Sequence, residues 1–505
     1  MRKLLIVLAF CLGNCFNISA QTGDEVIAEI ARLFNKNDLE TPIDNERFFI
    51  LPTGTFAHGQ IMDIPESNQS DLLHKVLIIV DSTLYSELFF DIDRYAHDIH
   101  YVYGCNIIME WVNNETCQDV KNIILNYQSH LDGCVFVGDI ATAWYEADDY
   151  AADSTKKNWP CDTYYMDLTG TWTDVDQNGS FDLYYGDSIP EIFVGRISTA
   201  DMGNLVGEIE GMHLYLKKNH RYWIGHRRVN KKNGLAYTNS PWQLDHTFLD
   251  SISYLYGPNN YDSYRPLTDT SFGKTDYLQK LCDDKYEFVQ LASHSNFDHH
   301  EQFGPTNSWI SGNTIFSNGT NVLGFNLFCC YACRWTSATN TNAFLAGDYI
   351  YSPKSDGLCV IGFTKAGGLY PYRNFYTSLQ NERTMGQALV DWWHQRIPYQ
   401  GSLLDLCWTF GLSIIGDPLV NFYHCTNGSC KEQITLNSYN YANSPLSYYL
   451  ASEKITIPST ASYIIPVGDH CILNAPTVEI QGEFLCPRGS SMEVLNEGCK
   501  PNCDE

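Results

Sequence analysis

The stretch "KVLIIVD", residues 75–81, is a continuous apolar run between a lysine and an aspartate. Such a run is typical of a β-strand that is buried on both faces, as in a parallel sheet. The next residues, "LYSELFFDIDRYAHDIHYVYG" (84–104), carry apolar residues at helical spacing and end in a glycine. A buried strand followed by such a helix predicts the first βα unit of a parallel sheet.

The same rhythm continues along the chain. Strands are expected at "CNIIMEWV" (105–112) and "GCVFVGD" (133–139), with a helix at 117–130 between them. The pattern resumes with further strands and helices. The later strands are expected at 233–240, 286–295, 322–330 and 357–365, and the later helices from about 244, near 341 and over 384–394. This alternation predicts an α/β fold: a doubly wound, mostly parallel sheet with helices on both faces.

The helical pattern stops after Cys425. The tail contains "EKITIPS" (453–459), "SYIIPVG" (462–468) and "PTVEIQGEFLC" (476–486), which are short alternating runs separated by turn residues. They predict a small all-β C-terminal domain. We therefore expect four parts, with these bounds: a signal peptide at 1–20, an N-terminal segment or propeptide at 21–70, the α/β domain at 71–424 and the β-rich domain at 425–505.

The first twenty residues have the pattern of a secretory signal. Arg2 and Lys3 precede an apolar run, and Ser19-Ala20 offers small residues for cleavage before Gln21. No later stretch is apolar for long enough to span a bilayer. The sequence therefore predicts a secreted or cell-surface protein without a membrane span.

The chain is strongly acidic. The formal net charge of the 505 residues is −27, and loss of Arg2 and Lys3 with residues 1–20 makes it −29. Nucleic-acid binding needs a basic surface, so the charge argues against a nucleic-acid partner.

Of the 18 cysteines, Cys11 and Cys15 lie in the expected signal peptide and 16 remain. In an exported protein such a number favours disulfide bonds over structural zinc. The last 81 residues are especially rich in cysteine, which suggests a small stapled module; they hold Cys425, Cys430, Cys471, Cys486, Cys499 and Cys503.

Candidate functional residues follow the expected strands. In a doubly wound sheet, ligands and catalytic groups gather at the carboxyl ends of the strands. His294 follows "FVQLAS", and Cys329-Cys330 follows "LGFNLF". Asp139 and Asn239 follow "VFVG" and "LAYT" in the same way. A cysteine and a histidine at neighbouring strand ends are the parts of a nucleophile in which the imidazole takes the proton of the thiol.

Three other interpretations of these cysteines remain open. Cysteine is among the most buried residue types, so Cys329, Cys330 and Cys333 could all be structural. Cys330 and Cys333 have the C-x-x-C spacing of thioredoxin-like redox pairs. The same two residues with His299 and His300 could bind zinc, although no second C-x-x-C accompanies them.

A series of short motifs, taken together, resembles the gingipain-type cysteine peptidases. The motifs occur in the order found in that family and cover roughly residues 72–423. They are "GCVFVGDI", "PCDTYYMDLTGTW", "PEIFVGRIS", "LASHSN", "FNLFCC", "GLCVIGFTKAGG", "TMGQAL" and "WTFGLSIIGDP". The resemblance implies a caspase-like fold and a secreted peptidase.

The resemblance also implies roles for particular residues. The family's catalytic histidine and cysteine fall on His294 and Cys330, and its oxyanion-binding N–H groups fall on the backbone of Cys330 and Ser295. Ser295 stands where the family has glycine, and Tyr331 follows the nucleophile where the family often has a small residue.

Two further residues are implied on the loop after "LAYT". The family holds a residue that orients the histidine there, which matches Asn239 or Ser240. Asp245 could bind a basic side chain of the substrate, or it could be an ordinary carboxylate on a helix face.

A separate motif, "DVDQNGSFD" (174–182), has the start of a calcium-binding loop. The expected ligands are Asp174, Asp176, Asn178 and Asp182, with Gly179 at the turn. The twelfth position of an EF-hand would be glutamate but is Tyr185 here. Structural calcium and a solvated acidic turn are the two alternatives; no organic cofactor is expected.

The sequence thus predicts a secreted cysteine endopeptidase that hydrolyses peptide bonds through an acyl-enzyme, with a protein or peptide as substrate. One alternative is a gingipain-related surface transpeptidase or processing enzyme. Another is a non-catalytic surface protein that keeps the fold and contacts the cell surface, protein or glycan through its C-terminal domain.

Overall fold

The structure is a computed structural model. It describes residues 60–61, 73–148, 156–187, 189–202, 205–225, 232–238, 246–264, 273–303, 308–336, 344–367, 370–396, 409–422, 431–437, 446–465, 470–488, 490–496 and 498–499. The expected signal peptide at 1–20 lies outside these ranges, as do Asn239, Ser240 and Asp245 and all but two residues of the expected segment 21–70.

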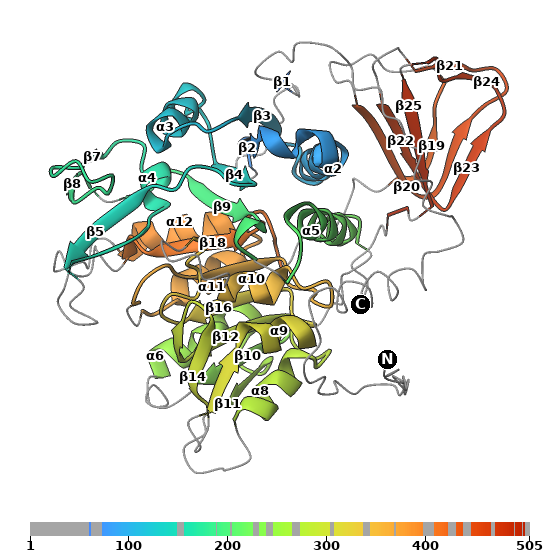
Figure 1. The fold of residues 1–505 in the computed structure, drawn as a ribbon. Coiled ribbons are helices and arrows are strands. Elements are labelled where there is room, and N and C mark those ends of the chain that lie inside the picture. The colour runs from blue at the N-terminus through green and yellow to red at the C-terminus, as the bar shows by residue number, and fades with distance from the viewer. Residues whose placement is uncertain are drawn as a thin grey trace, which may run out of the picture.

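One large sheet organises the part of the chain that the structure describes (Figure 1). Its eleven strands lie in the order β1-β3-β2-β4-β9-β18-β17-β16-β12-β10-β11. They are β1 (Gln60–Ile61), β2 (Lys75–Asp81), β3 (Asn106–Val112), β4 (Gly133–Val137), β9 (Phe193–Ile197), β10 (Gly234–Thr238), β11 (Tyr261–Tyr264), β12 (Phe288–Ala292), β16 (Gly324–Phe328), β17 (Cys359–Phe363) and β18 (Leu412–Gly416).

Most neighbouring strands of this sheet are parallel, as the sequence predicts. The two antiparallel contacts are β1 with β3, at the edge, and β17 with β18, in the interior. The sheet therefore consists of two parallel halves, β3-β2-β4-β9 and β17-β16-β12-β10-β11, which β18 joins. β1 belongs to the expected N-terminal segment, so at least these two residues extend the sheet.

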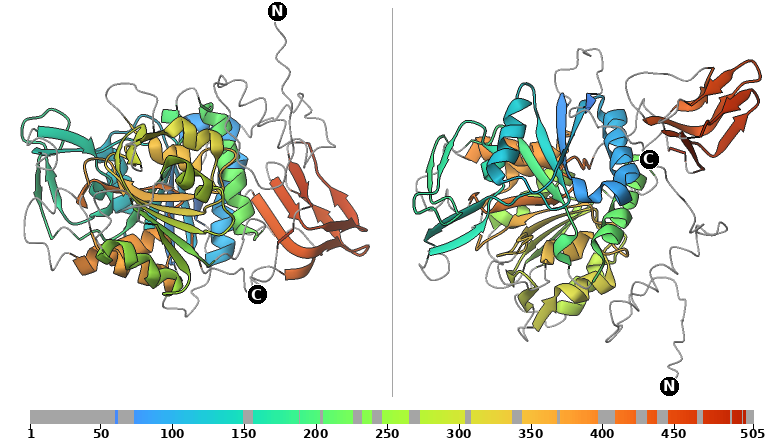
Figure 2. Two further views of the ribbon diagram at one scale, coloured as in Figure 1. Left: turned by 90° about the horizontal axis from the view of Figure 1, so that it is seen from below. Right: turned by 45° about the horizontal axis from the view of Figure 1, so that its top comes forward.

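Helices cover both faces of the sheet, which Figure 2 shows from below. α2 packs against α5 and α9 against α10, while α7, α11 and α12 form a second packed group. The α-helices are α2 (Tyr85–Tyr103), α3 (Cys117–Asn126), α4 (Thr163–Met166), α5 (Glu208–Trp223), α6 (His246–Leu249), α7 (Ser253–Tyr256), α8 (Lys274–Leu281), α9 (Gly312–Asn318), α10 (Leu345–Ile350), α11 (Arg373–Gln380) and α12 (Met385–Arg396). Three single turns of 3-10 helix are η1 (Ser82–Leu84), η2 (Ala200–Met202) and η4 (Asp250–Ile252).

Burial explains why these strands read as continuous apolar runs. Residues 76–80 of β2 and the whole of β4, β12 and β17 are buried. A strand with helices on both faces has no solvent side, so its sequence shows no alternation. The doubly wound fold class expected from the sequence is confirmed.

Shorter strands form hairpins beside the sheet. They are β5 (Trp144–Asp148) with β6 (Lys156–Pro160), β7 (Thr171–Thr173) with β8 (Leu183–Tyr185), and the three-stranded sheet β13 (His294–Asn296), β14 (His299–Phe303) and β15 (Ser308–Ser311). The last of these continues directly from the end of β12.

The C-terminal part is all β, as expected, but its strands pair in parallel. Leu446 of β20 is opposite His470 of β22, which is opposite Ser491 of β25. Tyr463 stacks on Phe484 at 6.0 Å between ring centroids. The strands are β19 (Lys431–Thr435), β20 (Leu446–Ile457), β21 (Ser462–Ile464), β22 (His470–Asn474), β23 (Thr477–Ile480), β24 (Glu483–Leu485) and β25 (Ser491–Leu495). Parallel pairing of successive segments is the geometry of stacked solenoid rungs.

Most of the described cysteines do not form the disulfide bonds that their number led us to expect. Eleven described cysteines carry thiols and form no disulfide, nine of them between Cys105 and Cys359. Many lie inside the core, such as Cys134 and Cys359, which are fully buried on β4 and β17. There the side chain packs as a small hydrophobe. Cys499 is disulfide-bonded.

None of the described helices is long and apolar enough to cross a membrane.

Candidate active site

The candidate catalytic residues leave the sheet from neighbouring parallel strands. β12 pairs with β16 in a register that sets Ala292 opposite Phe328. His294 and Cys330 each lie two residues beyond this pair. Because parallel strands are about 4.8 Å apart, equal offsets leave both residues just beyond neighbouring strands on the carboxyl edge of the sheet.

Hydrogen bonds tie the two strand ends together. The Ser295 hydroxyl donates to the carbonyl oxygen of Cys330 at 2.7 Å. The Ser293 hydroxyl lies 3.0 Å from the carbonyl oxygen of His294 and 3.2 Å from that of Glu301. The backbone on either side of His294 is therefore fixed relative to the cysteine.

The three cysteines of this region differ in exposure. Cys329 and Cys333 are buried, with 3% and 0% of their surfaces exposed. Burial raises the pKa of both thiols well above the usual value. Cys330 is half-buried. A thiol must ionise and meet its substrate to act as a nucleophile, so Cys330 is the best placed of the three.

A tight turn follows the candidate nucleophile. Its N–H groups at Tyr331 and Cys333 donate to the carbonyls of Lys365 and Phe363, both at 3.0 Å. Tyr331 has φ 59°, a left-handed conformation that glycine adopts without strain and an aromatic residue does not. Strained backbone of this kind is common at functional sites.

Ser295 needs no such conformation. It lies in strand β13, opposite His300, and its φ is not positive. The backbone conformation at this position therefore does not require the glycine that the gingipain-type family has there.

The imidazole of His294 is half-buried. Burial lowers the pKa of His294, and the negative charge of Glu301 acts in the opposite direction. A lowered pKa leaves the imidazole neutral at neutral pH, which is the form that accepts a proton from a thiol.

The neighbouring histidines are arranged differently. His300 is fully buried, and its Nε2 lies 2.8 Å from the hydroxyl of Tyr349. Burial lowers the pKa of His300 to about 3. His299 points to the opposite face of β14, because successive residues of a strand alternate. The zinc alternative, which needs both histidines with Cys330 and Cys333, does not form.

The loop expected to orient His294 lies outside the described residues. The roles of Asn239 and Asp245 therefore stay predictions. Glu301 was missed at the sequence level, although it is the described residue whose charge reaches His294. The alternation His-x-Asn and His-x-Glu across a short turn could have revealed it.

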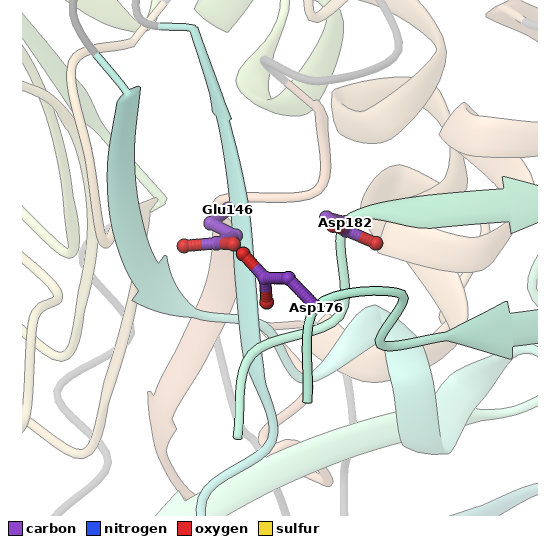
Figure 3. A group of neighbouring side chains, drawn as sticks. All are labelled: Glu146, Asp176 and Asp182. Carbon is purple, nitrogen blue, oxygen red and sulfur yellow. The ribbon is translucent and has the colours of Figure 1, made fainter. Parts of the chain in front are cut away.

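The expected calcium loop brings together only part of its predicted ligands. Carboxylate oxygens of Asp176 and Asp182 lie within 4.8 Å of one another and of Glu146, which the sequence analysis did not include (Figure 3). Asp174 serves the loop itself, because it accepts hydrogen bonds from the N–H groups of Asn178 and Gly179 at 3.2 and 2.8 Å.

Lys156 lies among the three carboxylates. Its ammonium group contacts Glu146 and lies 3.3 Å from Asp176 and 4.0 Å from Asp182. Asn178 donates its amide to Glu146 at 2.9 Å. Three carboxylates suit calcium as donors, but an ion would have to displace the lysine from this position.

The chain is similar to solved peptidase structures in fold. A crystal structure of the Arg-specific cysteine proteinase gingipain R (RgpB) aligns with a TM-score of 0.50 and 12% identity, over 74% of this chain and 84% of that one. A complex of the pro- and mature domains of Porphyromonas gingivalis RgpB aligns at 0.46 and 13%, over 72% and 84%. A structure described as a protease aligns at 0.46 and 11%, over 70% and 79%.

Comparisons with models of protein families and with curated protein sequences give no significant match. The likeness to gingipain R therefore shows the fold alone, which is the gingipain-type, caspase-like fold expected from the sequence.

Proposed function

From the gingipain-type fold and the pair of residues at its strand ends, we propose that the protein is a cysteine endopeptidase. The observation that carries the proposal is the shared register of β12 and β16, because half-buried His294 and Cys330 each follow the end of one of these neighbouring strands by two residues. The bond from Ser295 to the Cys330 carbonyl supports it, because it fixes the two strand ends relative to each other.

The proposed reaction starts with transfer of the Cys330 proton to His294. The thiolate attacks the carbonyl carbon of the scissile peptide bond, and the N–H groups of Cys330 and Ser295 bind the oxyanion. His294 then protonates the leaving amine as the C–N bond breaks, and an acyl-enzyme remains. Water, deprotonated by His294, hydrolyses the thioester and restores the thiol.

Two further roles belong to the proposal. Asn239 would orient the imidazole of His294, and Asp245 would bind a basic side chain of the substrate. Both assignments rest on the resemblance to the gingipain-type peptidases.

Calcium is proposed as a structural ion. Asp176, Asp182 and Glu146 would hold it, and binding would join the β7–β8 loop to strand β5. Its contribution would be rigidity of this region rather than chemistry at Cys330.

Export to the cell surface or medium is also proposed. It rests on the signal-like residues 1–20 and on the acidic composition. The β-rich tail would then be the part that contacts the cell surface or glycan.

Turnover of a pool of fluorogenic peptides tests the proposed activity. Cys330→Ala should lower kcat/KM by at least about 1000-fold. Cys282→Ala is the matched control, because Cys282 is another half-buried thiol, at the C-terminal end of α8. Equal activity of the Cys330→Ala variant and the unaltered protein would contradict the assignment of the nucleophile.

A further inference from the structure

A row of polar side chains leads away from His294 on the hairpin that follows it. In the antiparallel pairing of β13 with β14, His294 is directly opposite Glu301. Side chains of directly opposite residues lie on the same face of a sheet, with their Cβ atoms about 5 Å apart. The Glu301 carboxylate and the His294 imidazole therefore share one face of this hairpin.

Glu301 is held on its far side by His299. The distance from Glu301 Oε1 to His299 Nε2 is 3.1 Å, and the other ring nitrogen of His299 contacts Asp298. The ring of His299 stacks on Trp309 at 4.2 Å between centroids and 11° between planes. Stacking fixes the plane of the imidazole and thereby the direction in which it meets Glu301.

The backbone adds a second constraint. Because the Ser293 hydroxyl lies within hydrogen-bond distance of the carbonyls of both His294 and Glu301, it links the two strands at the position of the pair. The backbone contacts of Ser293 thus constrain the two residues relative to each other, and His299 constrains the side chain of Glu301.

We propose that Glu301 is a positioning residue for His294. Its carboxylate orients the imidazole toward Cys330 and stabilises the imidazolium that forms when His294 accepts the thiol proton. His299 and Trp309 hold Glu301 in place. This inference rests on the proposed cysteine peptidase function and adds a part that the expected loop at Asn239 does not supply.

The proton balance leaves Glu301 unchanged throughout. The proton moves from Cys330 Sγ to a ring nitrogen of His294 and later from His294 to the leaving amine. Glu301 stays ionised and acts through its charge and position, as the carboxylate of a catalytic triad does.

The groups around His294 define the expected pH effect. Among the described residues, Glu301 and His299 face it from β14 and Cys330 from the turn after β16, while His300 points into the core. Burial lowers the pKa of His294 and the charge of Glu301 opposes this. Without Glu301 only the effect of burial remains, so the imidazole stays neutral down to lower pH and the acidic limb of the activity profile moves down.

The first test compares pH profiles of the full-length protein and its variants. Glu301→Gln should lower kcat about tenfold with little change in KM, and should shift the acidic limb to lower pH. Glu301→Asp should restore part of the loss. Glu432→Gln, which removes an exposed carboxylate from β19, should leave both kcat and the profile unchanged.

A second measurement does not depend on turnover. In the full-length Cys330→Ala protein with ¹³C-labelled histidine, NMR titration gives the pKa of His294, whose signal His294→Gln identifies. Adding Glu301→Gln should lower that pKa; an unchanged pKa would overturn the positioning role. Failure of the peptidase function would instead appear as an absence of turnover and of Cys330 alkylation in the unaltered protein, whatever the titration shows.

Discussion

The two halves of the central sheet have the same strand order but different residues at their strand ends. In the first half β3, β2, β4 and β9 lie side by side, and in the second half β11, β10, β12 and β16 repeat this arrangement. In each half the strand that comes first in the chain, β2 or β10, lies between the next two strands of the chain. The chain therefore changes direction across the sheet there, which in doubly wound folds leaves a crevice for ligands at the carboxyl ends of the strands.

The first half places carboxylates at this edge. Asp81 ends β2 and Asp139 follows β4; burial raises the pKa of Glu208, and the charges of these two carboxylates raise it further. A pocket opens beside Asp139, with Asp201, Arg196 and Trp335 among its other lining residues.

The second half places a thiol and an imidazole at the corresponding edge. Cys330 and His294 follow β16 and β12, and a hairpin continues from β12 to bring Glu301 opposite His294. The comparison shows that topology fixes where a site can form, whereas the residues just after each strand decide which chemistry it performs.

The largest expected effect is the loss of peptidase activity when a histidine of the second half, but not of the first, is replaced. His294→Ala should lower kcat/KM by at least about 1000-fold, because no general base remains at the edge of the second half. The fold should persist, since His294 is only half-buried; the melting temperature checks this. His213→Ala on α5, over the first half, should retain activity. Loss of activity in His213→Ala but not in His294→Ala would contradict the comparison.

In the first half we expect the folding stability to depend on pH through a buried carboxyl group. Asp93 on α2 is 3% exposed, and burial raises its pKa to about 7. A carboxyl with a raised pKa stabilises the fold below the pKa of the unfolded chain, near 4, and this stability is lost as pH rises to about 7. Asp93→Asn does not titrate, so its stability relative to the unaltered protein should rise by about 2–4 kcal/mol between pH 4 and pH 8.

Urea unfolding at the two pH values measures this difference. His97, which lies 3.9 Å from Asp93 and has its pKa lowered to about 3 by burial, titrates in both proteins and largely cancels. Glu87→Gln, an exposed change on the same helix, is the control. A stability difference that does not vary with pH would show that Asp93 does not titrate in this range.

Calcium should stabilise the hairpins next to the first half. At a concentration 100 times Kd, a bound ion adds about 2.7 kcal/mol, so the melting temperature should fall on chelation and recover with added calcium. The double change Asp176→Asn and Asp182→Asn should abolish the response. Asp174→Asn should lower stability equally with and without calcium, because Asp174 accepts hydrogen bonds within its own loop. Identical melting curves in calcium and in chelator would exclude the ion.

The smallest expected effect concerns the neighbour of the nucleophile. Cys329 is buried and its pKa is raised by burial, so Cys329→Ala should cost about 1 kcal/mol of stability and leave activity in place. Thermal unfolding and peptide turnover together measure this. If a folded Cys329→Ala protein lost all turnover, Cys329 and not Cys330 would be the nucleophile.

Sequence patterns predicted the large sheet well because its strands are buried on both faces and leave continuous apolar runs. They also placed His294 and the pair Cys329-Cys330 after strand ends, which are readable from where such runs stop, whereas the choice of Cys330 came mainly from the family resemblance. Glu301 and Glu146 were missed because they come from hairpins: a short two-residue alternation gives a weak signal, and cross-strand partners such as His294 and Glu301 depend on register.

The parallel pairing of the C-terminal strands was likewise not predictable from alternation. Alternating residues indicate which face is buried but not which strand lies alongside. The expectation of disulfides rested on cysteine number, whereas burial of thiols such as Cys134 and Cys359 is a property of the core.

Covalent labelling followed by mass spectrometry identifies the nucleophilic cysteine and its dependence on His294. The full-length protein is treated with a peptidyl acyloxymethyl ketone, which reacts with a cysteine activated by a neighbouring imidazole, and the modified peptide is sequenced. We expect one adduct on Cys330 that is absent in His294→Ala and persists in Cys333→Ser. An adduct on Cys329 or Cys333, or labelling that does not depend on His294, would contradict it.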